Sequence, residues 1–126
     1  MLDTHVWLWT LVQPSRLPKG LLDLLGQASQ DVFLSAASTW ELSIKYAIGK
    51  MPLPESPKHF IAPRLIRDNV RFLPISLRHT VEVAELPTHH TDPFDRLLVV
   101  QAQVEKMRLV TADTVLEKYD VDLWKI

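Results

Sequence analysis

The sequence predicts a single α/β domain over residues 1–126, with a central, mainly parallel sheet of about four or five short strands between two layers of helices. Short apolar runs typical of buried strands are separated by longer segments with helical periodicity, which is the pattern of strand–helix–strand units. The nine prolines are scattered rather than gathered in a linker, and no internal repeat is visible. The 126 residues, 47% hydrophobic and 23% charged, suffice for one core.

The composition excludes several functional classes. Without cysteine, the chain has no disulfide framework, thiolate zinc site, iron–sulfur cluster or cysteine nucleophile. No apolar run reaches the roughly 18 residues of a membrane span, and no basic segment precedes an apolar one as in a secretory signal. We therefore expect a cytoplasmic protein without membrane contact. The net charge of −1 gives no general attraction for nucleic acid, so a role in binding it rests on a local site.

Apolar runs, caps and prolines set the expected boundaries of the elements. In the first half we expect a strand ending at Asp3, helices over 4–12 and 17–25, a strand over 32–34 and a helix from Ser35 to Gly49. In the second half we expect helices over about 57–68 and 78–86, a helix from Asp92 to about Lys106, a short helix near 115–119, and strands over 70–75, 109–111 and 121–125.

The apolar pattern also predicts which helix faces are buried. We expect Trp40, Ile44 and Ala47 on the inward face of the helix that begins at Ser35, with Trp40 in the core. Trp7 and Trp9 suit either a core or an interface, where aromatic residues are enriched.

Four acidic residues are placed by this topology at one edge of the sheet. Asp3 ends the first strand, and Asp113 comes two residues after the Leu-Val-Thr strand. Glu41 lies in the second turn of the helix after the second strand, and Asp95 lies in the first turn of the helix that Asp92 and Pro93 open. Parallel sheets bind ligands outside the carboxyl ends of their strands, so we expect the four acids to share one cleft.

Each acid also has an ordinary structural explanation. Asp3 could cap a helix, Asp95 could stabilise a helix N-terminus, and Asp113 could be a turn residue. Glu41 could form a capping box with Ser38 or an ion pair with Lys45. The joint placement favours function, because four anions in one cleft repel one another unless a cation lies among them. Oxygen ligands without thiolates favour Mg²⁺ or Mn²⁺. Such a site is suited to the hydrolysis of a phosphodiester.

Four segments resemble, in order and over essentially the whole chain, the PIN domain and in particular the VapC-like toxins of type II toxin–antitoxin pairs. They are LDTHVWLW at 2–9, ASTWELSIKYAIGKMPLP at 37–54, THHTDPFDRLLVVQAQ at 88–103 and LVTADTVLEKYDVDLW at 109–124. The most specific part is H-x-DPFDR-LL followed by Q-A. Only Met1 and Leu2 precede Asp3, where the family usually has a longer first strand, which suggests either a less rigid Asp3 or a start further upstream.

The resemblance implies an α/β/α fold, Mg²⁺- or Mn²⁺-dependent endoribonuclease activity, a homodimer and inhibition by a cognate antitoxin. It places the metal-binding and catalytic acids at Asp3, Glu41, Asp95 and Asp113. Weaker candidates are Thr4, Ser38 and Thr111, whose hydroxyls could hold water at the metal or bond to the local backbone. Asp92 is a further acid, which first suits helix capping. Arg96 could contact substrate phosphates or pair with nearby acids.

Three other interpretations stay open. A catalytically inactive PIN domain would act only as a binding module. A metallophosphatase is suggested by Asp3-x-His5 after a first strand, although the GD-x-x-D and GNH elements of that class are absent. A zinc site of His5, His89 and His90 is disfavoured, because adjacent loop histidines point in different directions and zinc needs three or four converging ligands.

Overall fold

A parallel sheet forms the centre of the computed structural model, which describes residues 1–126. Its strands are β1 (Val32–Ser35), β2 (Val70–Leu73), β3 (Leu109–Thr111) and β4 (Leu123–Lys125). Leu2 forms parallel bridges to both Leu34 and Val110, so it joins the β1–β2 pair to the β3–β4 pair. The resulting order is β2, β1, Leu2, β3, β4, which confirms the predicted mainly parallel sheet of short strands.

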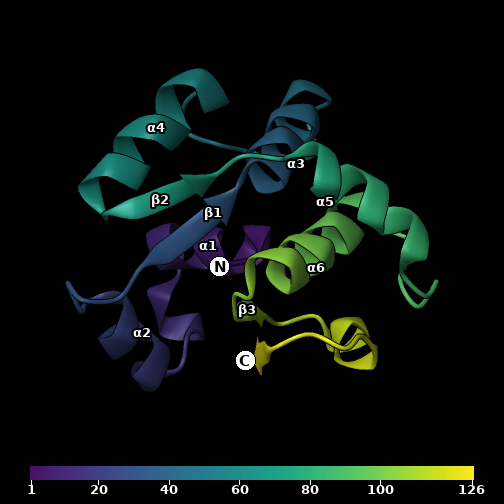
Figure 1. The fold of residues 1–126 in the computed structure, drawn as a ribbon. Helices are drawn as coiled ribbons and strands as arrows, with labels where there is room; N and C mark the ends of the chain where they lie inside the picture. The colour runs from purple at the N-terminus through teal and green to yellow at the C-terminus, as the bar shows by residue number, and fades with distance from the viewer.

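Six α-helices connect and cover these strands (Figure 1). They are α1 (Thr4–Val12), α2 (Lys19–Leu25), α3 (Ala36–Ala47), α4 (Pro57–Arg67), α5 (Leu77–Glu82) and α6 (Pro93–Glu105). Short 3₁₀ helices occupy Pro14–Arg16, Val83–Glu85 and Thr114–Lys118. The predicted helices and the four later strands are present, with ends that differ by a few residues and with 3₁₀ geometry near 83–85 and 114–118. The predicted first strand is reduced to the bridging residue Leu2.

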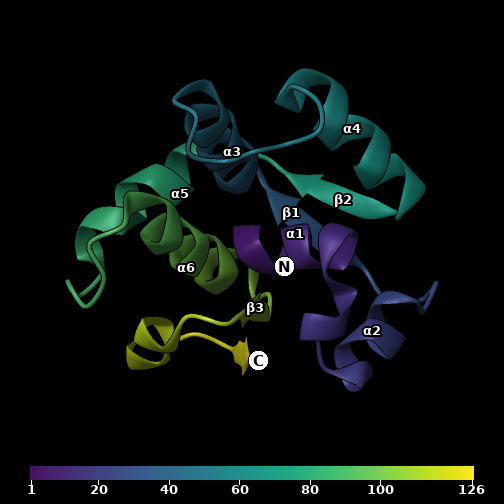
Figure 2. The same cartoon turned by 180° about the vertical axis from the view of Figure 1, so that it is seen from behind.

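Two hydrophobic cores lie on opposite faces of the sheet. Leu2, Leu34 and Val110 belong to the first core, with α1, α2 and α4, whereas Met1 and Leu109 belong to the second, with α6. Neighbouring residues of one strand thus enter different cores, because successive strand side chains point to opposite faces. Figures 1 and 2, seen from opposite sides, show α1 behind and then in front of β1. The fold is a three-layer α/β/α arrangement.

The inward face of α3 differs from the one that the sequence predicts. Trp40 and Ile44 are 57% and 37% exposed, and Ala47 is also exposed. The buried face instead carries Ala37, Ser38, Glu41 and Leu42. The prediction is wrong because it assumed that apolar residues mark the buried face, whereas here a serine and a glutamate lie on it. Trp40 packs edge-on against the ring of Phe94 on the outside, with 5.2 Å between centroids.

The two tryptophans of α1 differ in environment. Trp7 is fully buried in the first core and makes an edge contact with Phe60, with 6.2 Å between ring centroids. Trp9 is half-buried, and the guanidinium of Arg16 lies 4.2 Å from the centre of its ring. Trp7 is therefore a core residue. None of the helices has the length and apolar character needed to cross a bilayer.

Candidate metal site

The deep half of the site is built at the starts of α1 and α3. Asp3 follows Leu2 and is the N-cap of α1, where its Oδ1 accepts a hydrogen bond of 2.8 Å from the Val6 N–H. Glu41 lies on the buried face of α3, and its Oε2 is 2.6 Å from the ammonium nitrogen of Lys45. Both acids are almost fully buried, at 6% and 3% exposure. The predicted ion pair with Lys45 is confirmed.

Thr111, at the end of β3, connects the deep half to the next acid. Its Oγ1 accepts a hydrogen bond of 3.0 Å from the Asp113 N–H. Burial raises the pKa of Asp3, while hydrogen bonds from the Thr111 hydroxyl and the Val6 N–H partly offset that rise. Thr111 therefore bonds both to the local backbone and to a carboxylate of the site.

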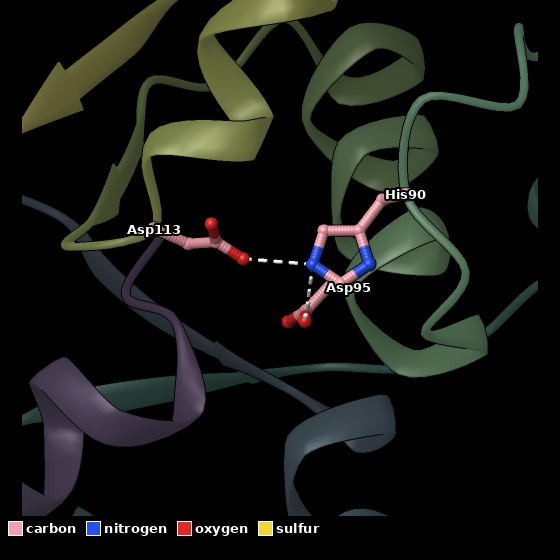
Figure 3. A group of neighbouring side chains, drawn as sticks. All are labelled: His90, Asp95 and Asp113. Carbon is pink, nitrogen blue, oxygen red and sulfur yellow. Dashed lines mark hydrogen bonds and ion pairs between the residues drawn. The ribbon is translucent and has the colours of Figure 1, made fainter.

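The shallow half of the site consists of Asp95, Asp113 and a histidine between them (Figure 3). Asp95 lies in the first turn of α6, and Asp113 caps the 3₁₀ helix after β3 by accepting from the Val115 N–H at 2.8 Å. His90 Nε2 lies 2.7 Å from Asp113 Oδ2 and 3.3 Å from Asp95 Oδ2. The three potential ligand atoms of these residues lie within 4.8 Å of one another.

The charges of the acids act on one another across both halves. The pKa of Asp95 is raised to about 7, first by burial and then by the negative charges of Asp92, Glu41 and Asp3, with His90 acting in the opposite direction. The geometry thus places Asp95 in the electrostatic field of both deep acids. A carboxyl group in such surroundings gains most from a neighbouring cation.

Two buried hydroxyls in the deep half have no protein partner. Thr4 Oγ1 and Ser38 Oγ lack any hydrogen bond, although the two residues are 2% and 0% exposed. Ser38 is not the cap of α3, because the Ala37 N–H is accepted by Ser35 Oγ at 2.9 Å. The capping-box explanation of Ser38 and Glu41 is therefore excluded. Buried polar groups without partners are uncommon in proteins, and they point to a ligand or water at this place.

The two weaker candidates near α6 support the scaffold. Asp92 is the N-cap of α6, and its Oδ1 accepts from the N–H groups of Phe94 and Asp95 at 2.8 and 3.3 Å, which confirms the capping role. The Arg96 guanidinium donates to the carbonyl oxygens of Pro87 at 2.8 Å and Val83 at 3.1 Å. These bonds tie the segment before α6 to the helix and leave Arg96 committed to backbone carbonyls rather than to an acid.

Of the three histidines considered as zinc ligands, only His90 lies among the acids. His5 is exposed on α1 beside Trp9, and His89 packs edge-on against Tyr119. The sequence analysis considered His90 only as a zinc ligand and did not predict its contacts with two carboxylates. The available signal was its position two residues before the Asp92 cap.

The chain is similar in sequence to a known family of proteins. The model of the PIN domain matches residues 1–122. The chain belongs to the PIN-domain family. It is 35% identical to Ribonuclease VapC16 of Mycobacterium tuberculosis (strain ATCC 25618 / H37Rv) over 74 residues, which are 53% of this chain and 52% of that protein. The match thus spans about half the length of this curated relative.

The PIN fold also recurs in a solved structure. The crystal structure of VapBC2 from Rickettsia felis, bound to a DNA fragment from their promoter, superposes with a TM-score of 0.75 over 100% of this chain and 97% of that one. The two sequences are 20% identical, so this likeness concerns the fold. It agrees with the three-layer architecture described above.

The donor set of this PIN domain fits a divalent metal ion. The candidate ligands are carboxylate oxygens, which Mg²⁺ and Mn²⁺ prefer, and the two unpartnered hydroxyls lie next to Asp3 and one turn before Glu41. A cation would also relieve the mutual repulsion that contributes to the raised pKa of Asp95.

Proposed function

We propose that this PIN domain is an endoribonuclease that depends on Mg²⁺ or Mn²⁺ and acts as the toxin of a type II toxin–antitoxin pair. The observation that supports the proposal best is the grouping of Asp95 and Asp113 around His90, where the charges of Asp3 and Glu41 also act on Asp95, in a chain that belongs to the PIN family. The similarity to a protein named a ribonuclease supports RNA as the substrate.

The four acids would hold the ion, and the rest of the site would orient the reactants. A divalent ion supplies charge neutralisation at the phosphate and makes water a nucleophile at neutral pH. The buried Thr4 and Ser38 hydroxyls can donate to and accept from a water molecule beside Asp3 and Glu41. The Lys45 ammonium, half-buried at the rim next to Glu41, is placed to meet the phosphate backbone of RNA.

The proposed partners are an RNA substrate and a cognate antitoxin protein, both of which the protein would meet in the cytoplasm. The fold match to a toxin–antitoxin complex supports the antitoxin. An acidic cleft can accept an arginine or lysine from such a partner, because a guanidinium pairs with carboxylates bidentately. The homodimer implied by the family resemblance stays a prediction; exposed apolar side chains such as Trp40 and Leu77 are available for it.

The proposal is tested by metal-dependent cleavage of RNA. We expect the purified protein to cleave a fluorescent single-stranded RNA with Mn²⁺ or Mg²⁺, to lose this activity in EDTA, and to bind Mn²⁺ in calorimetry. The control is Asp31→Asn, because Asp31 forms an exposed ion pair with Arg71 just before β1, at the end of that strand opposite to its carboxyl end. Cleavage that persists in EDTA contradicts the metal mechanism. Mn²⁺ binding without RNA cleavage favours the binding-module interpretation, and release of phosphate from monoesters favours the metallophosphatase.

A further inference from the structure

The hydrogen bonds around His90 define which of its ring nitrogens carries the proton. Nδ1 accepts a hydrogen bond of 2.9 Å from the Asp92 N–H, and a backbone N–H can only donate. Nδ1 therefore presents a lone pair, and the proton of the neutral ring is on Nε2. The Nε2 side faces carboxylate oxygens of Asp113 and Asp95, which are acceptors (Figure 3).

This tautomer is the reverse of the one that a metal-binding histidine uses. Such a histidine directs a lone pair at the metal and donates its other N–H to a carboxylate or carbonyl. In His90, the nitrogen among the acids is the donor, and the far nitrogen accepts from the backbone. The ring is thus arranged to hold carboxylates, not to bind a cation.

His90 is the main support of the shallow half of the site. His90 Nε2 is hydrogen-bonded to Asp113 and lies 3.3 Å from Asp95 Oδ2, and it is the one side chain that contacts the Asp95 carboxylate at this range. In Asp113, Oδ1 accepts from the Val115 N–H and Oδ2 from His90, so both oxygens are restrained. The His90 Nε2–H restrains these groups through a hydrogen bond and a close contact, whereas the Lys45 ammonium on Glu41 adds a competing positive charge.

The segment that carries His90 is itself held in place. The His90 N–H donates to the Tyr119 hydroxyl at 2.8 Å. Arg96 binds the carbonyl oxygens of Pro87 and Val83 on the same segment. The His90 side chain is only 15% exposed. Its ring is therefore fixed by tertiary contacts on both sides, as a group that orients ligands must be.

We propose that His90 is a positioning residue that does not ligate the metal, and that its Nε2–H, hydrogen-bonded to Asp113 and in contact with Asp95, keeps these two carboxylates in the orientation in which they hold the divalent ion. This inference rests on the proposed metal-dependent function and adds a residue to it. Partners that orient metal ligands typically contribute about 10- to 100-fold to metal affinity.

The first test is the Mn²⁺ affinity of four proteins, measured by calorimetry at one pH: the natural protein, His90→Ala, His90→Gln and His89→Ala. We expect His90→Ala to weaken Mn²⁺ binding by about 10- to 100-fold. His90→Gln should recover part of the loss, because its amide N–H can reach the same oxygens, and it covers the case in which the alanine variant folds poorly. His89→Ala, the exposed neighbour, should bind as the natural protein does. Unchanged or tighter binding in folded His90→Ala and His90→Gln overturns the proposal.

The second test asks directly whether nitrogen coordinates the metal. Pulsed electron paramagnetic resonance of the Mn²⁺-loaded natural protein should show no coupling to a directly bound imidazole nitrogen. A strong coupling that disappears in His90→Gln shows that His90 is a ligand and overturns the proposal. The outcome is separate from the proposed function: equal Mn²⁺ affinities with intact RNA cleavage reject only the role of His90, and weakened binding without cleavage by the natural protein rejects only the nuclease.

Discussion

The two halves of the acidic site are supported in different ways. Asp3, the N-cap of α1, and Glu41, in the second turn of α3, are almost completely buried, and the hydroxyls of Thr4 and Ser38 have no partners. The side chains of Asp95 and Asp113 are 25% and 32% exposed, and His90 joins them. The deep half is thus rigid but incompletely hydrogen-bonded, whereas the shallow half is held by a hydrogen-bond network. Polar substitutions should therefore have different effects on stability in the two halves.

The largest effect is expected at Asp95, a carboxylate of the shallow half whose pKa is raised by burial and by charges that include those of the deep acids Glu41 and Asp3. Asp95→Asn should reduce metal-dependent RNA cleavage more than about 100-fold, because it removes a charged ligand and not only the partner of one. The same change should stabilise the metal-free protein at alkaline pH by an amount on the order of a few kcal/mol, since it removes a carboxyl group that burial and three neighbouring anions disfavour.

The stability difference between the natural protein and Asp95→Asn should depend on pH. The pKa of Asp95 is about 7 in the folded chain and near the ordinary aspartate value of 3.8 in the unfolded chain, so between these pH values the folded state binds more protons. Stability of the natural protein should therefore fall as pH rises from about 4 to about 7, and then level off. Melting temperatures in EDTA from pH 5 to pH 8 should diverge between the natural protein and Asp95→Asn, and Mn²⁺ should close the gap by binding the natural protein. Parallel curves, as expected for the Asp31→Asn control, would contradict the prediction.

The places of several acids in the fold could be predicted from the sequence. In a parallel sheet, residues just after a strand lie at the carboxyl edge, so the positions of Asp3 and Asp113 follow from strands that are visible as apolar runs. Glu41 followed from its place in the next helix. The burial of the helix face that carries Glu41 could not be predicted, because helix periodicity identifies the apolar side as the buried one, and Trp40 on that side is exposed.

The shallow half depends on contacts that sequence spacing does not encode. His90 meets Asp113 across 23 residues, and the Arg96 guanidinium reaches Val83 across 13. Both contacts arise because the segment before α6 folds back on the helix, and its path is set by tertiary hydrogen bonds rather than by local propensity. The positions of the acids in the fold were therefore predictable, but the contacts of His90 with two of them were not.

A moderate effect is expected at Lys45, whose partly exposed ammonium pairs with buried Glu41. Lys45→Gln removes the ammonium 2.6 Å from buried Glu41, so the metal-free protein should lose about 1–2 kcal/mol of stability. Mn²⁺ affinity should rise, because the ion no longer competes with that ammonium for the carboxylate. Thermal melts and Mn²⁺ titrations test both effects, with Lys58→Gln, an exposed lysine of α4, as the control for lost charge. Weaker Mn²⁺ binding than in the control would show that Lys45 orients Glu41 for the metal.

The smallest change in stability is expected where a buried hydroxyl has no partner. Ser38→Ala and Thr4→Val remove oxygens that make no hydrogen bond in the protein, so stability should stay within about 1 kcal/mol or rise. Thr111→Val is the matched contrast: it removes an oxygen that accepts from the Asp113 N–H and should cost about 1–2 kcal/mol.

RNA cleavage, unlike stability, should depend strongly on the hydroxyls of Ser38 and Thr4. If Ser38 and Thr4 hold water beside the acids, RNA cleavage should fall about 10-fold in each variant while the melting temperature is unchanged or higher. Such a pairing of lost activity with kept stability is the mark of a group that serves a ligand, because a purely structural hydroxyl would have been hydrogen-bonded within the protein. Ser38→Ala with full activity would instead mean that the deep half contributes carboxylates alone, and that the ordering of water falls to the network around His90.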